Sequence, residues 1–150
     1  MEDELFSRLI AFWSDSAIKM NAGADEAALR RFESHYRVML PSDMRRYFLH
    51  VDGMAEDEMD PVHHVRFWSV QELQPVPDAF EDPVYQEQVF RDFYIFADYS
   101  LWAHAYAIRL ADMVTLRHEV CIVGGEAPRT VAGSFAEFIE SYLVRPQMIF

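Results

Sequence analysis

Histidine and carboxylate side chains are the residues of this chain that could bind a metal ion or transfer protons. The chain has six histidines: His63 and His64 stand close after Asp60, and His104 and His118 fall in segments expected to be strands. Adjacent residues of a strand point to opposite faces, so His63 and His64 could not bind one metal ion without a kink. The spacings HxxxH and HExxH and the zinc-deaminase pattern are absent. We therefore expect no catalytic metal and no cofactor.

A covalent nucleophile has no better support. Cys121, the single cysteine, lies in the apolar run EVCIV and is expected to be a buried small hydrophobic residue. No serine occupies the glycine-flanked turn that exposes the nucleophile of a hydrolase, and residues 124–130 lack the lysine and the spacing of a phosphate-binding loop. The sequence predicts a protein that is not an enzyme. A small-molecule-binding or metal-using enzyme built on the same domain is the alternative.

Carboxylates gather after a helix-like segment in the stretch LPSDMRRYFLHVDGMAEDEMD, residues 40–60. They are Glu56, Asp57, Glu58 and Asp60. The stretch lacks the alternating ligands and the central glycine of an EF-hand loop, so its spacing does not favour calcium binding. Two interpretations remain, a solvated surface loop and a surface that contacts a partner.

The composition is strongly acidic. The 150 residues include 25 Asp and Glu against 13 Lys and Arg, which gives a formal net charge of −12. Such a surface repels nucleic-acid phosphates and the anionic leaflet of a membrane, and it attracts basic proteins over about a Debye length. We therefore expect a basic protein partner and no contact with nucleic acid or membrane. Solubility is the other interpretation of this charge.

The elements that must position these residues begin with helices. Apolar residues at helical spacing predict helices over Glu2–Trp13 and Asp25–Tyr36, the second with Asp25 as its N-cap. Pro41 suits the first position of a third helix, and Gly53 suits its left-handed end. The core-facing stripes of the three helices are Leu5, Phe6, Leu9, Phe12 and Trp13; Leu29, Phe32 and Tyr36; and Met44, Tyr47, Phe48 and Val51.

Strands are expected in the second half, in HHVRFWSV, FYIFADYS, WAHAYAIRL and HEVCIV. In WAHAYAIRL a bulky row that includes Trp102 and His104 alternates with small residues, which indicates a strand beneath helices or a shallow groove. Ser69 and Glu72 form a capping box, and prolines make residues 74–88 a loop with at most a short helix. A last helix begins after Ser134 and ends before Pro146, and its core-facing stripe is Phe135, Phe138, Ile139, Tyr142 and Leu143. Helices at both chain ends around mostly antiparallel strands predict an α+β fold.

Length and composition limit the architecture further. A chain of 150 residues with 51% hydrophobic and 15% aromatic residues is sufficient for one domain with one core, residues 1–150. The acidic amino terminus lacks the features of a secretory signal, and no apolar run reaches the roughly 20 residues of a membrane helix. We therefore expect a cytoplasmic protein. Nothing in the sequence predicts an oligomeric state.

Three segments follow one another in a familiar order: a helix leading into LPSDMRRYFLHVDG, a strand pair around YIFADYSLWAHAYAIRL and a terminal VAGSFAEFIESYL. Together they resemble the SUKH superfamily of the Smi–Knr type over most of residues 23–143, and two of them carry its signatures. The first matches its leucine-proline signature with Leu40, Pro41, Met44, Arg45, Phe48, Leu49 and Gly53. The third matches its late valine-alanine and serine-phenylalanine signature with Val131, Ala132, Ser134, Phe135, Phe138, Ile139, Tyr142 and Leu143. Two departures stand out: Asp52 replaces the usual asparagine before Gly53, and SLWAHAY replaces a turn that is rich in glycine and aspartate in many relatives.

The resemblance implies a binding protein. Bacterial members are similar to cytoplasmic immunity proteins that neutralise polymorphic toxins, often nucleases or deaminases, and fungal relatives act through protein contacts in cell-wall regulation. The acidic surface is compatible with a basic cognate toxin domain, because it imitates the charge of nucleic acid. Our expected partner-binding residues are therefore the four carboxylates above, with Trp68 and Trp102 as candidates for the buried contacts that give specificity.

Overall fold

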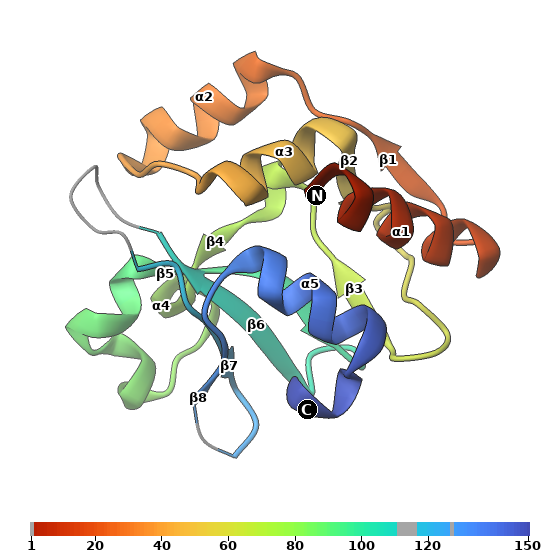
Figure 1. Ribbon diagram of the computed structural model, residues 1–150. Helices are drawn as coiled ribbons and strands as arrows, with labels where there is room; N and C mark the ends of the chain where they lie inside the picture. Colours follow the sequence, from red (N-terminus) through yellow and green to blue (C-terminus); the bar gives the residue numbers. More distant parts are fainter. Residues whose placement is uncertain (1, 111–116, 127) are drawn as a thin grey trace.

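The computed structural model describes residues 2–110, 117–126 and 128–150 (Figure 1). The α-helices are α1 Glu2–Asp15, α2 Glu26–Tyr36, α3 Ser42–His50, α4 Val76–Ala79 and α5 Phe135–Val144. The strands are β1 Met20–Ala22, β2 Val51–Met54, β3 Val65–Phe67, β4 Gln74–Pro75, β5 Phe93–Tyr99, β6 His104–Arg109, β7 Val120–Val123 and β8 Arg129–Ala132. Short 3₁₀ helices are η1 Val70–Glu72, η2 Pro83–Gln86, η3 Gln88–Asp92 and η4 Pro146–Met148.

The main sheet is antiparallel throughout its described pairs. Its strand order is β3-β5-β6-β7-β8, and β4 pairs with β5 beside β3. A separate antiparallel pair joins β1 to β2. The fold is therefore α+β with helices at both chain ends, as the sequence predicts.

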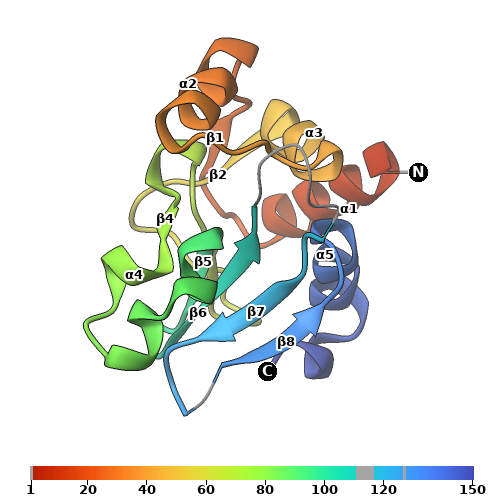
Figure 2. The same ribbon diagram turned by 90° about the vertical axis from the view of Figure 1, so that its left-hand side faces the viewer.

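Helices cover the two faces of the sheet unequally. The helices α1, α3 and α5 contact one another and form a layer on one face, while α4 lies on the other side of the sheet (Figure 2). One cluster of buried hydrophobic residues runs through the molecule, and it includes five residues of the predicted helix stripes: Phe32, Phe48, Phe135, Phe138 and Tyr142. No helix in the described ranges is both long and apolar enough to cross a membrane.

The helix caps read from the sequence are confirmed. The Asp25 carboxylate accepts a hydrogen bond from the Ala28 N–H at 2.8 Å and caps α2. The Ser134 hydroxyl accepts one from the Glu137 N–H at 3.1 Å and caps α5. The Ser69–Glu72 capping box is also present, at the start of η1.

The assignment of Gly53 as the end of α3 is wrong. The helix ends at His50, and Gly53 lies inside strand β2 with a φ of 69°. A Cβ atom at this position would come within 2.5 Å of the Trp68 carbonyl oxygen. Glycine is needed here because two backbone segments approach closely and because φ is positive, rather than to terminate a helix.

Four short strands and one boundary also differ from the expectation, and one of them is β4 at the start of the expected loop 74–88. The strands β1, β2 and β8 were expected as loop or helix end, although Ala127 of the loop before β8 lies outside the described residues. Strand β6 begins at His104, so Trp102 belongs to the preceding turn rather than to the strand. That turn lies at the same end of the sheet as the loop before β3 (Figure 1).

Candidate functional site

The acidic loop, residues 55–64, connects β2 to β3 and is organised by one buried carboxylate. Asp60 is 0% exposed. Its Oδ1 atom accepts hydrogen bonds from the N–H groups of Val62 at 2.8 Å and His63 at 2.5 Å, and its Oδ2 atom accepts from Val65 at 3.4 Å. Asp60 therefore cannot meet a partner, and its expected place on the binding surface is corrected to a role in holding the loop.

A side-chain relay ties Asp60 to the helical layer. The Tyr142 hydroxyl on α5 donates to Asp60 Oδ2 at 2.5 Å, and the Trp13 indole N–H on α1 donates to the Tyr142 oxygen at 3.2 Å. Burial raises the pKa of Tyr142 far above its usual value, and the Asp60 carboxylate raises it further. Tyr142 therefore keeps its proton and serves as a donor, which helps to satisfy a carboxylate buried inside the protein.

The other end of the acidic loop is held by Arg66 on β3. Its guanidinium donates to the carbonyl oxygens of Met54 at 3.4 Å and Ala55 at 3.3 Å, and to the Glu72 carboxylate at 3.0 Å. Burial alone would raise the pKa of Glu72, but hydrogen bonds from Arg66 and Ser69 bring it below its usual value. The loop is thus fixed at both ends.

The remaining three carboxylates point outward from this fixed loop. Glu56 and Asp57 are exposed, and Glu58 is partly exposed. Glu56 also lines a small polar pocket of about 250 Å³ together with Arg66 and Glu72. These three consecutive residues therefore place negative charge on a loop whose two ends are held by hydrogen bonds.

The two tryptophans expected at the binding surface, Trp68 and Trp102, occupy different environments. Trp68 is 4% exposed, and its indole N–H donates to the buried Asp98 carboxylate at 2.7 Å. Trp102 is 46% exposed and packs on Trp68, with ring centroids 5.2 Å apart. The expectation that Trp68 contacts a partner directly is therefore corrected. Trp68 is buried, and its ring supports the ring of Trp102 from below the surface.

One hydrogen bond links the acidic loop to the turn that carries Trp102. The Ser100 N–H donates to the His64 carbonyl oxygen at 2.8 Å. On either side of this link two apolar side chains, Val62 and Leu101, are largely exposed. The structure thus brings Trp102 and the acidic loop to one end of the sheet. Neither Val62 nor Leu101 was expected at a binding surface from the sequence.

The side chains with possible catalytic chemistry do not converge. Within residues 2–110, 117–126 and 128–150, no three His, Cys, Asp or Glu side chains are grouped so that they could hold a metal ion. Burial raises the pKa of the Cys121 thiol to about 12, which removes the thiolate that nucleophilic chemistry needs. His104 stacks on Tyr99 at 4.6 Å, and burial together with Arg129 lowers its pKa. These groups fill structural positions.

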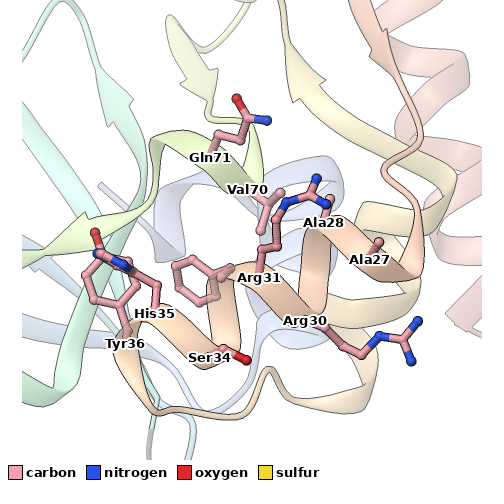
Figure 3. A pocket seen from close by; sticks show the side chains of 10 residues that line it. Ala27, Ala28, Arg30, Arg31, Ser34, His35, Tyr36, Val70 and Gln71 are labelled. Atoms are coloured by element: carbon pink, nitrogen blue, oxygen red, sulfur yellow. The ribbon is translucent and has the colours of Figure 1, made fainter.

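A groove of about 840 Å³ runs between α2 and η1. Figure 3 shows Arg31 extending beside Ala28 and Val70, while Arg30 points away from them. Phe32 and Tyr36 supply apolar and aromatic lining, and no carboxylate is among the described lining residues. The groove is therefore suited to bind an anionic or aromatic group of a ligand. It does not supply the paired carboxylates that acid–base catalysis would need.

Comparison with known proteins places the chain in a family. The sequence matches the model of the SMI1 / KNR4 family (SUKH-1) over residues 23–141. A search of curated proteins gives no match. The matched segment begins before α2 and ends within α5, so it contains the acidic loop, both tryptophans and the whole sheet. The chain therefore belongs to the SMI1 / KNR4 family (SUKH-1), in agreement with the resemblance seen in the sequence.

Proposed function

We propose that this protein is a non-enzymatic binding module of the bacterial cytoplasm that neutralises a basic toxin domain of the nuclease or deaminase type. The SUKH family is generally immunity-protein-like and non-catalytic, and this membership supports the proposal. The observation that carries it is the group of outward-facing carboxylates Glu56, Asp57 and Glu58 on a loop fixed at both ends. A fixed negative surface imitates the phosphates that a nucleic-acid-processing toxin binds.

The alternative function is a small-molecule-binding or metal-using enzyme. The groove along α2 would be its ligand site. Ser34 and His35 line it, but the described lining residues include no carboxylate, and no group of three metal-ligand side chains occurs among the described residues. A toxin gene directly beside the gene for this chain is expected only for the binding module, so genomic neighbourhood separates the two functions.

The acidic loop is expected to act mainly on the rate of association. Changing Glu56, Asp57 and Glu58 together to serine should slow association with the toxin domain encoded by the adjacent gene by about 3-fold to 10-fold at low salt. The reason is that charged side chains at the rim of an interface attract the partner before contact. The difference should shrink towards physiological and higher salt, where the Debye length falls to about 8 Å and below. Stopped-flow association rates over a salt series measure this effect.

A second triple variant controls for net charge. Glu4, Glu87 and Asp92 are exposed carboxylates outside the acidic loop, and changing them to serine removes the same amount of charge. This variant should associate at nearly the rate of the unchanged protein. Equal rates for the unchanged protein and both variants at every ionic strength would make the acidic loop a solvated surface only.

A further inference from the structure

The turn between β5 and β6 holds an unusual backbone conformation. Ser100, Leu101 and Trp102 have φ angles of 49°, 57° and 74°, so three successive residues lie in the left-handed region. None of them is glycine, and residues with a side chain adopt this region at an energetic cost. The Ala103 N–H closes the turn by donating to the Tyr99 carbonyl oxygen at 2.9 Å. A conformation of this kind persists only where surrounding contacts enforce it, and such strain is concentrated at functional sites.

The strained turn presents apolar side chains to the solvent. Leu101 is 83% exposed, which is the largest value among the large hydrophobic residues of the described ranges. Trp102 combines exposure with fixed placement, because its ring packs against Trp68 at 5.2 Å and against Phe80 at 5.9 Å. Trp68 is itself fixed by its hydrogen bond to Asp98. The Trp102 ring therefore needs little further ordering when a partner binds.

Exposed acidic residues occur in the segments that adjoin this apolar centre. The exposed residues Glu81 and Asp82 directly follow Phe80, and the exposed Glu126 directly follows Gly125. A Cβ atom at Gly125 would lie 3.7 Å from the Ala103 carbonyl oxygen, so the β7–β8 loop adjoins the turn.

On its other side the turn is linked to the acidic loop through the hydrogen bond from Ser100 to His64. Arg129, the first residue of β8, is a basic residue close to this surface, and its guanidinium donates to the Phe150 carbonyl oxygen. The surface is thus an apolar centre with an acidic rim.

We propose that Leu101 and Trp102 are the anchor of the partner-binding surface and enter an apolar recess of the toxin domain that is bordered by lysine and arginine side chains. This inference rests on the proposed function. The turn would determine which toxin domain is bound, and the acidic rim would speed the approach of that domain. A buried aromatic side chain within a charged rim is the arrangement typical of an interface hot spot. The left-handed turn holds both side chains outward, where an ordinary extended strand would direct neighbouring residues to opposite faces.

The test measures binding and stability separately. The probe is the catalytically inactivated toxin domain encoded beside the gene for this chain, with its dissociation constant for each variant measured by calorimetry. Trp102→Ala should raise the dissociation constant about 30-fold or more, chiefly through faster dissociation. Leu101→Gly should raise it about 10-fold, while its melting temperature stays equal or rises by up to about 4 °C, because glycine relieves the left-handed strain.

Met39→Ala is the matched control, since Met39 is also 46% exposed but lies between α2 and α3. It should leave the dissociation constant within about twofold, as expected of a residue outside the interface. Weaker binding of Leu101→Gly at an undiminished melting temperature supports the anchor, because a structural role alone would not separate the two readouts.

The outcomes distinguish the two proposals. If the unchanged protein does not bind the toxin domain, the proposed function fails and this inference fails with it. If the unchanged protein binds and both turn variants bind equally well, only the anchor is overturned. A clear fall in the melting temperature of Leu101→Gly would also overturn it, because the turn would then be stabilised by Leu101 itself rather than held under strain for binding.

Discussion

Phe138→Ala is expected to lower the free energy of unfolding by about 3–5 kcal/mol, as found when a packed core phenylalanine is truncated. Phe138 on α5 is 0% exposed. Its ring lies 4.8 Å from the ring of Tyr106 on β6, 5.2 Å from Phe96 on β5 and 6.1 Å from Phe67 on β3. Alanine would leave a cavity beside three strands. Because the strands are hydrogen-bonded to one another, they cannot move inward to fill that cavity. Urea unfolding followed by circular dichroism measures the loss.

Val144 on the same helix supplies the control. Its side chain is 55% exposed, so Val144→Ala should change the free energy of unfolding by no more than about 0.5 kcal/mol. If Phe138→Ala unfolds at the same urea concentration as the unchanged protein, α5 does not pack on the sheet in the way described above.

Elements governed by local signals could be predicted from the sequence. The start of α2 follows from Asp25 and the start of α5 from Ser134, because a cap bonds backbone groups within three residues of itself. The stripe residues Phe48 and Phe138 are buried because helical spacing alone sets which face they share. Fold class follows from the order of such elements.

Elements that depend on distant partners could not be predicted. Strand β2 forms because it pairs with β1, about thirty residues earlier in the chain, and a run as short as VDGM carries no alternation that would show this. Gly53 has the residue type of a helix stop, but its neighbour in space is the Trp68 carbonyl. The sequence therefore predicted correctly that this position adopts a positive φ, but the predicted reason, a helix end, was wrong.

The candidate site shows the same division. Exposure of Glu56 and Asp57 follows from their place in a polar run, whereas burial of Asp60 in the same run depends on Tyr142, 82 positions away. Asp60 did carry one local signal, since aspartate followed by Pro61 favours a turn closed by the aspartate side chain. The left-handed turn at Ser100, Leu101 and Trp102 carried no local signal, because none of these residues is the glycine, asparagine or aspartate that favours positive φ, and the alternation of WAHAYAIRL indicated a strand instead.

Asp60→Ala is expected to lower the free energy of unfolding by about 3–5 kcal/mol. The buried carboxylate accepts from three backbone N–H groups and from the Tyr142 hydroxyl, and hydrogen bonds to a charged group contribute about 1.5–3 kcal/mol each, without adding fully. Alanine would leave those donors unpaired inside the protein. Urea unfolding measures the loss. Tyr142→Phe should cost less, about 1.5–3 kcal/mol, because only one donor to the carboxylate is removed.

The double variant and a neighbouring carboxylate decide whether the relay is the cause. Asp60→Ala combined with Tyr142→Phe should lose less stability than the two single variants added together, by about 1 kcal/mol or more, because the residues share one hydrogen bond. Asp57→Ala, an exposed change in the same loop, should stay within about 0.5 kcal/mol of the unchanged protein. Since Asp60 also fixes residues 62–65 of the acidic loop, its loss should reduce the salt-dependent part of the association rate even under conditions where the variant is folded. Additive losses in the double variant, or a loss in Asp57→Ala equal to that in Asp60→Ala, would contradict a loop held by the buried carboxylate.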